Sequence, residues 1–284
     1  MKKTEHKVLK IIGLLLLMFL IWAGFEIYIS ENWLTVNHYE LSNAGFDEPI
    51  KIVIISDLHD HDFGNSLPDK IHEQNPDLII MAGDMLNQDT DLEEQLYKVV
   101  SELKDIAPVY YGLGNHEMIY MENHPSFVND LEQHGCTVLD YLYKDIEVKG
   151  NQIRLGGLYD YPYGTGDCYA EDAPDEIKYF MKDFVGTDRY KIMIAHRPDS
   201  YVFGDDTKVY NIDLVVSGHL HGGQAIIPFK GGLYGGDQGW FPKYVHGLYE
   251  KDLIHMVITS GLGTSKKKIP RFNNIPEILV LTIN

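Results

Sequence analysis

Five short apolar runs in this sequence are each followed by polar side chains of a kind that binds metal ions. The runs are Ile50–Ile55, Leu78–Met81, Val109–Leu113, Ile192–Ala195 and Leu214–Val216. Runs of this length and composition predict buried β-strands. Helical patterns alternate with them, which is typical of an α/β fold, and functional sites in such folds lie where the strands end. We therefore expect the residues after the five runs to converge on one site.

The side chains after these runs are carboxylates, imidazoles and one amide. They occur in five blocks, in the order Asp57-Leu-His59, Gly83-Asp84, Gly114-Asn-His-Glu117, His196 and Gly218-His-Leu-His221. Taken singly, most of these blocks are weak evidence, since a lone histidine after a strand usually packs in the core. The ordered set is far more specific, and its nitrogen and oxygen atoms suit manganese, iron or zinc rather than thiolate chemistry. The sequence therefore predicts an enzyme with two metal ions.

His219 and His221 flank a single residue, which constrains the backbone between them. On an extended strand, side chains two residues apart share a face, but the chain must also leave the strand here to form a site. Glycines surround the pair at Gly218, Gly222 and Gly223. They indicate a turn that can direct both rings inward.

The order of the five blocks resembles the calcineurin-like metallophosphoesterase family, whose pattern is D-x-H, G-D, G-N-H-[DE], H and G-H-x-H. The resemblance extends from Ile50 to the C-terminus and implies a four-layer αββα sandwich. It also implies two metal sites, the first formed by Asp57, His59, Asp84 and His221 and the second by Asp84, Asn115, His196 and His219. Asp84 would bridge the two ions. His116 would contact the substrate phosphate or the leaving group, and Glu117 replaces the commoner aspartate, which the family allows.

The resemblance and the chemistry together predict a metal-dependent phosphoester hydrolase. A hydroxide that bridges two cations roughly 3.5–4 Å apart can attack phosphorus near neutral pH, because the cations lower the pKa of water. His116, if protonated, can stabilise the negative charge that develops on the leaving oxygen. The substrate would be a phosphodiester, a phosphomonoester or a pyrophosphate. A metal-dependent binding or sensor domain without turnover is the alternative from a different functional class.

Segments after the histidine pair resemble a membrane-associated bacterial branch of the family. They are His219–Gln224, Pro228–Tyr234, Gly239–Tyr244, Gly247–Tyr249, Gly261–Gly263 and Pro276-Glu277. Members are called phosphohydrolases or phosphodiesterases, and one related group hydrolyses the pyrophosphate of a UDP-linked diacylated glucosamine, which gives a second alternative. An arginine often precedes Gly-Leu-Gly in this branch, whereas Thr259 and Ser260 stand here. Six apolar or aromatic residues would rim the site or pack on the domain: Leu233, Tyr234, Trp240, Phe241, Tyr244 and Tyr249.

The N-terminal segment is long enough to cross a membrane. Val8–Ile29 is almost wholly apolar, and a spanning helix needs about 20 such residues. Lysines precede the segment and Glu26 and Glu31 follow its apolar core, which places the N-terminus in the cytoplasm and the catalytic domain outside. Secretion after signal cleavage is the alternative, although no small-x-small cleavage site is evident. We expect an anchor at residues 1–30, a juxtamembrane connection with an edge strand at residues 31–49, and the metallophosphoesterase domain at residues 50–284.

Charge and cysteine content restrict the partners and the covalent framework. The chain has 24 basic and 42 acidic residues, a net charge of −18, which argues against nucleic-acid binding because phosphates would be repelled. The expected partners are a phosphorylated small molecule or lipid-linked substrate at the outer face, and the membrane itself. Cys136 and Cys168 imply no disulfide framework, and the sequence leaves their pairing open.

Overall fold

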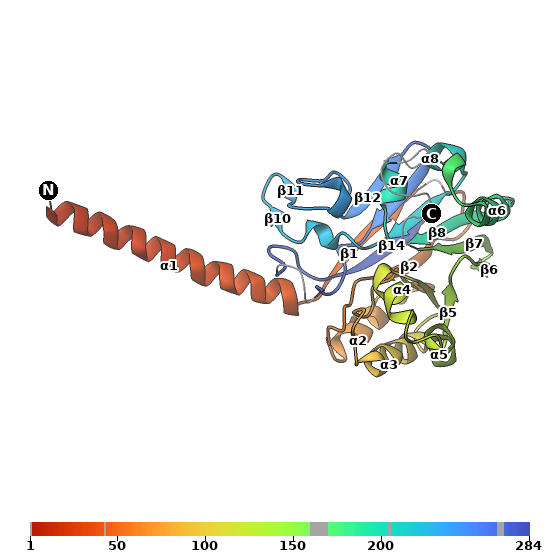
Figure 1. Ribbon diagram of the computed structural model, residues 1–284, viewed down its shortest axis with the longest axis horizontal. Helices are drawn as coiled ribbons and strands as arrows, with labels where there is room; N and C mark the ends of the chain where they lie inside the picture. The colour runs from red at the N-terminus through yellow and green to blue at the C-terminus, as the bar shows by residue number, and fades with distance from the viewer. Residues whose placement is uncertain (1, 43, 160–169, 204–205, 266–269) are drawn as a thin grey trace.

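The computed structural model of the chain describes residues 2–42, 44–159, 170–203, 206–265 and 270–284. A long helix, α1 (Lys2–Asn32), projects from an α/β domain that contains two large β-sheets (Figure 1). Among the described residues, α1 is the one helix long and apolar enough to cross a membrane, by its length and composition. The predicted N-terminal apolar helix and the predicted α/β class are therefore both present.

The first sheet has six strands and carries three of the five predicted motifs. Its order is β1 (Thr35–Leu41), β14 (Glu277–Ile283), β2 (Ile50–Ile55), β3 (Leu78–Met81), β4 (Val109–Gly112) and β5 (Cys136–Leu139). Strands β2 to β5 are parallel, β14 runs antiparallel to β2, and β1 pairs with β14 in parallel. The edge strand expected within residues 31–49 is thus β1, and it extends the catalytic domain's own sheet.

The second sheet also has six strands and carries the other two motifs. Its order is β12 (Gly247–Lys251), β13 (Ile254–Ile258), β9 (Leu214–Ser217), β8 (Tyr190–Ala195), β7 (Asn151–Leu158) and β6 (Tyr143–Val148). Antiparallel hairpins form both edges. In the hairpin of β6 and β7, Lys149 has φ 50° and Gly150 has φ 81°, the left-handed pair that a two-residue turn requires.

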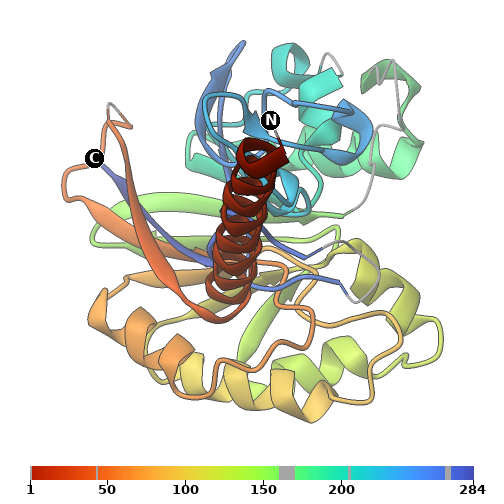
Figure 2. The ribbon, with the colours of Figure 1, turned by 90° about the vertical axis from the view of Figure 1, so that its left-hand side faces the viewer.

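Helices cover the outer face of each sheet (Figure 2). The helices over the first sheet are α2 (Ser66–Glu73), α3 (Glu93–Lys104), α4 (Asn115–Met121) and α5 (Phe127–His134). The helices beside the second sheet are α6 (Asp175–Phe184), α7 (Asp199–Phe203) and α8 (Asp206–Val209). Shorter elements are the strands β10 (Ile226–Ile227) and β11 (Gly231–Gly232) and the 3₁₀ turns η1 (Ala170–Asp172), η2 (His221–Gly223) and η3 (Gly236–Gln238).

Three apolar cores separate four layers. In β2, the side chains of Ile52 and Ile54 pack between the sheets, and those of Val53 and Ile55 pack against α2–α5. A third core lies between the second sheet and α6. Because both faces of β2 are buried, a one-residue slip of its register would exchange the two sets of side chains. The four-layer αββα sandwich implied by the family resemblance is present.

Cys136 is a free, buried thiol at the start of β5, and its Sγ donates to the carbonyl oxygen of Leu131 at 3.4 Å. Burial raises the pKa of this thiol to about 12, so it stays protonated and unreactive. Cys168 lies outside the described residues, so its pairing stays open.

Candidate metal centre

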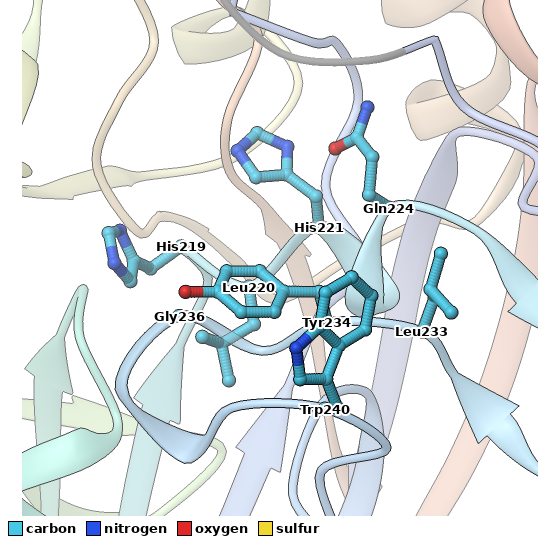
Figure 3. Close-up of a pocket in the computed structure, with 8 residues that line it drawn as sticks. All are labelled: His219, Leu220, His221, Gln224, Leu233, Tyr234, Gly236 and Trp240. Atoms are coloured by element: carbon cyan, nitrogen blue, oxygen red, sulfur yellow. The ribbon is translucent and has the colours of Figure 1, made fainter.

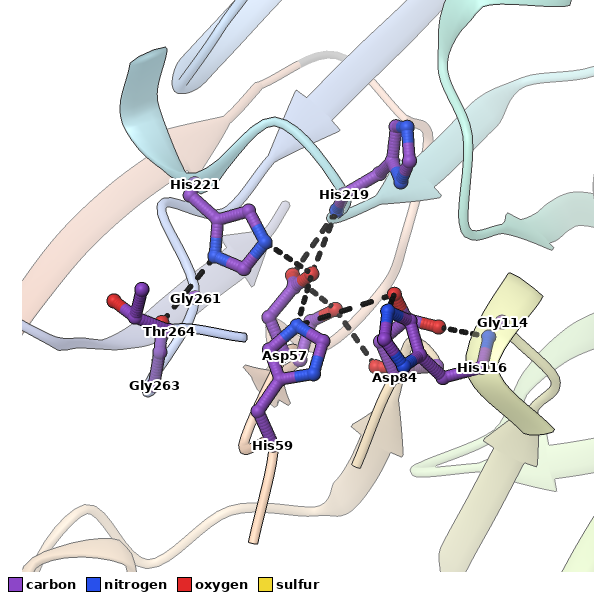
Figure 4. Close-up of polar contacts among 12 residues, drawn as sticks. Asp57, His59, Asp84, Gly114, His116, His219, His221, Gly261, Gly263 and Thr264 are labelled. Carbon is purple, nitrogen blue, oxygen red and sulfur yellow. Dashed lines mark hydrogen bonds and ion pairs between the residues drawn. The ribbon is translucent and has the colours of Figure 1, made fainter. Parts of the chain in front are cut away.

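All eight predicted site residues lie together at the carboxyl ends of strands from both sheets, and Figure 4 shows six of them. Asp57 and His59 follow β2, Asp84 follows β3, Asn115 and His116 begin α4, His196 follows β8, and His219 and His221 follow β9. Three overlapping groups have potential ligand atoms within 4.8 Å of one another. These groups are Asp57 with His59 and His221, His59 with Asp84 and His116, and Asp84 with His196 and His219. Each group can hold a metal ion.

Left-handed backbone conformations turn the chain sharply at these strand ends. The φ angle is 54° at Asp57, 49° at His59, 52° at Asp84, 69° at His219 and 47° at His221. Non-glycine residues rarely adopt such angles, which cost roughly 1–2 kcal/mol each. Strain of this kind persists only where the surrounding structure enforces it. The predicted turn after β9 is present as η2, where Gly222 also has a positive φ of 60°.

Asp57 links the two sheets through its carboxylate. Its side chain is fully buried and accepts hydrogen bonds from the hydroxyl of Ser56 at 2.7 Å and from the backbone N–H of His219 at 3.0 Å. The other oxygen, Oδ1, lies 3.5 Å from Nε2 of His221. Hydrogen bonds to a charged carboxylate are strong, so this side chain is fixed before any ligand arrives.

Asp84 and His196 form a buried pair at the centre of the site. Oδ2 of Asp84 lies 3.1 Å from Nε2 of His196, and Oδ1 accepts the backbone N–H of His116 at 2.8 Å. Burial raises the pKa of Asp84, but the charge and hydrogen bond of His196 outweigh it and hold that pKa well below its usual range. Burial lowers the pKa of His196, whereas Asp84 and Asp57 raise it, to about 9. Asp84 therefore remains an anionic oxygen donor near neutral pH, as a metal ligand requires.

Backbone carbonyls orient two of the imidazoles. Nδ1 of His196 lies 2.7 Å from the carbonyl oxygen of Ala82, and Nδ1 of His221 lies 3.2 Å from that of Gly263. A carbonyl oxygen can only accept a hydrogen bond, so each ring donates from Nδ1 and directs Nε2 toward the carboxylates. Histidines that bind metals are oriented in this way.

The amide of Asn115 supports the same conclusion. Its Oδ1 atom is buried and accepts no hydrogen bond from the part of the chain that the structure describes. A buried acceptor without a partner costs about 1–3 kcal/mol, and a cation would satisfy it. The donor set is otherwise carboxylate oxygen and imidazole nitrogen, which suits divalent transition metals. The residues present therefore fit the metal ions that the sequence predicts.

His116 is held differently from the other imidazoles. Its Nδ1 accepts the backbone N–H of Gln88 at 3.0 Å, and its Nε2 lies 3.9 Å from Oδ2 of Asp84. Because Nδ1 is an acceptor, the ring is neutral and its proton is on Nε2. The sequence left the protonation state of this ring open, and the contact with Gln88 favours a neutral donor that points into the site. Such a group can donate a hydrogen bond to a phosphate or leaving-group oxygen.

Glu117 joins two of the site's loops. Its carboxylate is fully buried and accepts the backbone N–H groups of Asp84 at 2.8 Å, Met85 at 2.7 Å and Gly114 at 2.8 Å, and the hydroxyl of Tyr111 at 2.7 Å. Burial, together with the neighbouring Asp84, raises the pKa of Glu117 to about 7. The side chain thus fixes the loop after β3 to the start of α4, a role that the motif alone does not reveal.

Arg271 is a buried residue that the sequence patterns do not single out. Its guanidinium is 1% exposed and donates to the carbonyl oxygens of Ser260 at 2.8 Å, Gly263 at 3.0 Å and Asn274 at 2.9 Å. Burial lowers the pKa of Arg271 to about 10, so it remains charged. The same Gly263 oxygen accepts from His221, and Arg271 therefore supports a predicted ligand indirectly. No periodicity or motif marks it, because its partners are backbone atoms.

A cavity of about 470 Å³ adjoins the site on the side of η2 (Figure 3). His219 and His221 form one wall, and Leu233, Tyr234 and Trp240 lie opposite them. Three of the six residues predicted to rim the site therefore line this cavity. The other three do not: Tyr244 and Tyr249 pack on the third core, and Phe241 lies outside the cavity.

Sequence comparison is consistent with this geometry. A family model described as calcineurin-like phosphoesterase matches residues 50–223, more than half of the chain, and this range includes all eight predicted site residues. The chain belongs to the calcineurin-like phosphoesterase family. It is therefore a phosphoester hydrolase of a family that uses divalent metal ions.

Curated relatives of this phosphoesterase include bacterial metallophosphoesterases. An uncharacterized metallophosphoesterase of Campylobacter jejuni, Cj0846, is 31% identical over 92% of this chain and 67% of its own length. The phosphodiesterase YaeI of Escherichia coli is 28% identical over 92% of each chain. Among solved structures, a phosphopantetheinyl hydrolase from Mycobacterium tuberculosis matches with a TM-score of 0.48 and 15% identity, over 79% of this chain and 95% of its own.

Proposed function

We propose that this phosphoesterase hydrolyses a phosphoester with two metal ions. The first ion would be bound by Asp57, His59, Asp84 and His221, and the second by Asp84, Asn115, His196 and His219. The observation that carries the proposal is the overlap of the three groups, since Asp84 belongs to two of them and its Oδ2 lies within 4.0 Å of three imidazoles. Manganese, iron and zinc all suit these atoms.

The chain's own residues would prepare the site for in-line attack on phosphorus. When bound, two such cations lower the pKa of the attacking water and neutralise the phosphate oxygens. Asp57 and Asp84 are held as carboxylates by the hydrogen bonds described above, so the site does not have to reorganise. His116 would donate from Nε2 to a phosphate or leaving-group oxygen, and the Gln88 amide at Nδ1 keeps that proton in place.

The substrate is proposed to be a phosphodiester, phosphomonoester or pyrophosphate at the outer face of a membrane. Helix α1 supports this location, with its lysines on the cytoplasmic side and the catalytic domain outside. The similarity to a phosphodiesterase supports a diester, and the apolar cavity beside His219 and His221 supports a substrate with an apolar part.

The test uses the full chain in detergent micelles, stripped of metal and resupplied with manganese, zinc or iron. Bis(p-nitrophenyl) phosphate and p-nitrophenyl phosphate would be assayed beside Asp84→Asn. We expect turnover that depends on metal and is lost in Asp84→Asn. Two ions bound per chain with no turnover of either substrate would instead favour a binding or sensor domain.

A further inference from the structure

Four aromatic side chains lie exposed on loops beside the cavity. Phe229 is 108% exposed, Trp240 69%, Tyr234 49% and Phe241 46%. They are joined into one surface, since Tyr234 and Trp240 contact edge to face at 5.4 Å and Nζ of Lys230 lies 5.0 Å from the centre of the Phe241 ring. We call these four residues the aromatic patch. Aromatic clusters this exposed usually mark an interaction site.

Packing within the chain does not account for Phe229, the most exposed ring of the patch. Phe229 has φ 67° and occupies the third position of the turn Ile227-Pro228-Phe229-Lys230, in which Lys230 N–H donates to the Ile227 carbonyl oxygen at 3.0 Å. A type II turn of this kind favours glycine or asparagine there. Phe241 also has a positive φ, 55°. The Phe241 ring at least contacts Lys230, whereas the Phe229 ring is fully exposed, so a contact outside the chain would offset the strain at Phe229.

The position of helix α1 indicates which surface outside the chain lies next to the patch. Trp22 of α1 contacts Phe272 edge to face, with ring centres 5.4 Å apart. Phe272 belongs to the segment that pairs with β10, because Ile226 N–H donates to its carbonyl oxygen at 3.0 Å. Trp22 is seven residues before Ile29, which is roughly 10 Å back along the helix axis. The hairpin of β10 and β11 therefore reaches the level of the apolar part of α1, not merely its end.

The views of the whole chain agree with this placement. In Figure 1 the β10–β11 hairpin and α1 lie on the same side of the domain, and Figure 2 looks onto that side along the helix. The last turns of α1 pack on the domain, since Ala23, Glu26, Ile27 and Ser30 are partly or fully buried at helical spacing. A membrane crossed by α1 would consequently meet the hairpin and the patch.

The charges near the patch suit a lipid surface. Lys230 is exposed over the Phe241 ring of the patch, Lys243 is exposed with its Nζ 4.6 Å from the centre of the adjacent Tyr244 ring, and Asp237 is an exposed acid nearby. The chain as a whole carries a net charge of −18, which would repel anionic lipid. Two lysines among aromatic side chains match the interfacial composition of membrane-contacting segments, where rings lie at the headgroup level and ammonium groups contact phosphates.

We propose that the aromatic patch is a second membrane contact, which holds the mouth of the cavity at the lipid surface. Tyr234 and Trp240 belong to both the patch and the cavity wall, and His219 and His221 lie across the same cavity. A phosphoester could reach the metal centre while its acyl chains stay in the bilayer. The substrate class is then a membrane-embedded phosphoester lipid. This inference rests on the proposed function and on α1 as a membrane span.

The membrane contact is tested by quenching of Trp240 fluorescence in the full chain. The chain has three tryptophans, and the double variant Trp22→Phe/Trp33→Phe retains only Trp240. In phosphatidylcholine vesicles with brominated acyl chains, we expect its emission to fall by at least half relative to unbrominated vesicles. The matched variant Trp33→Phe/Trp240→Phe retains Trp22, which should be quenched if α1 spans the bilayer.

Two fluorescence results would overturn the proposal. Emission from Trp240 that ignores brominated lipid but is quenched by aqueous iodide would place the patch in water. Emission that neither quencher reaches would indicate that a second copy of the chain covers the patch. An unquenched Trp22 would also contradict the proposal, because α1 would not then span the bilayer.

Turnover distinguishes the substrate class from the proposed function. The variant Phe229→Asn suits the turn and lies outside the cavity, and Tyr179→Gln on α6 removes an aromatic ring that is 72% exposed elsewhere. With a p-nitrophenyl diester of diacylglycerol phosphate in vesicles, Phe229→Asn should raise the lipid concentration for half-maximal rate about tenfold. Tyr179→Gln should leave it unchanged, and neither should alter turnover of bis(p-nitrophenyl) phosphate.

The two proposals fail in different ways. A wild-type chain that cleaves the soluble diester but not the vesicle-bound one contradicts the lipid substrate alone, as does an equal effect of Phe229→Asn and Tyr179→Gln. A metal-loaded chain that cleaves neither substrate contradicts the proposed function, and the fluorescence experiment still decides the membrane contact.

Discussion

The loops of the metal centre and the loops of the aromatic patch both contain bulky residues at positive φ, but their surroundings differ. His59 and His221 are buried, and His221 is held by the carbonyl of Gly263. Phe229 is fully exposed and lies at the tip of a hairpin. In the first region, packing and hydrogen bonds within the chain offset the strain. In the second region they do not, which indicates that the stabilising contact is made with something else.

The largest effect is expected in the metal-centre loops, on removal of the donor that faces the substrate. His116→Ala should lower kcat by about 10²- to 10⁴-fold, because a positioned proton donor contributes that much. Metal content should stay at the wild-type value, since His116 is not proposed as a ligand. His134→Ala, on α5 and outside the site, is the control. Equal activity of wild type and His116→Ala would remove this histidine from the mechanism.

The next largest effect is expected when Arg271, which shares the Gly263 carbonyl oxygen with His221, is substituted. Arg271→Met deprives the carbonyls of Ser260 and Gly263 of a donor, so the free energy of unfolding should fall by roughly 2–5 kcal/mol. Metal affinity should also fall 10- to 100-fold through His221. Calorimetric metal titration and denaturant unfolding measure the two effects.

A matched arginine separates stability from metal binding. Arg154 on β7 is also nearly buried, and it binds Asp145 and the carbonyl oxygen of Asp183 far from the site. Arg154→Met should lower stability to a similar extent and leave metal affinity unchanged. If both variants lose metal affinity equally, Arg271 has no specific positioning role.

How far the sequence predicts the structure depends on how local each signal is. The strand ends and their ligands follow from apolar runs and the residues next to them, so Asp57, Asp84 and His196 lie where the sequence puts them. Arg271 escapes prediction because it donates mainly to backbone carbonyls, which leave no mark in the side-chain pattern. The strand β5 is also unpredicted, since its four residues form a strand only by pairing with β4.

Stability should depend on pH through Asp199, near the cavity but outside the ligand set. Burial, together with the neighbouring Asp237, raises the pKa of Asp199 to about 6, although Arg197 acts in the opposite direction. A raised carboxyl pKa favours the folded state at low pH, and that contribution is lost as pH rises from about 4 through 6. Relative to wild type, Asp199→Asn should therefore gain roughly 2 kcal/mol of stability between pH 4 and pH 7. A constant difference across this range would contradict the assignment, and urea unfolding at several pH values measures it.

The smallest effect is expected for a substitution in the aromatic patch, and it contrasts the patch with the metal-centre loops. Phe229→Asn should raise the free energy of unfolding in detergent by about 1 kcal/mol, because asparagine tolerates positive φ better than phenylalanine. The same change at His59, another residue at positive φ, should instead weaken metal binding. A loss of stability in Phe229→Asn would show that the ring does pack within the chain.

The central claim is that Asp84 is shared by two metal ions, and counting the ions tests it most directly. Elemental analysis of the reconstituted full chain should find two ions per wild-type chain and fewer than two in Asp84→Asn. Asp77→Asn, at the opposite end of the same strand β3, should keep two. A single ion in the wild-type chain, or two ions retained in Asp84→Asn, would contradict the account.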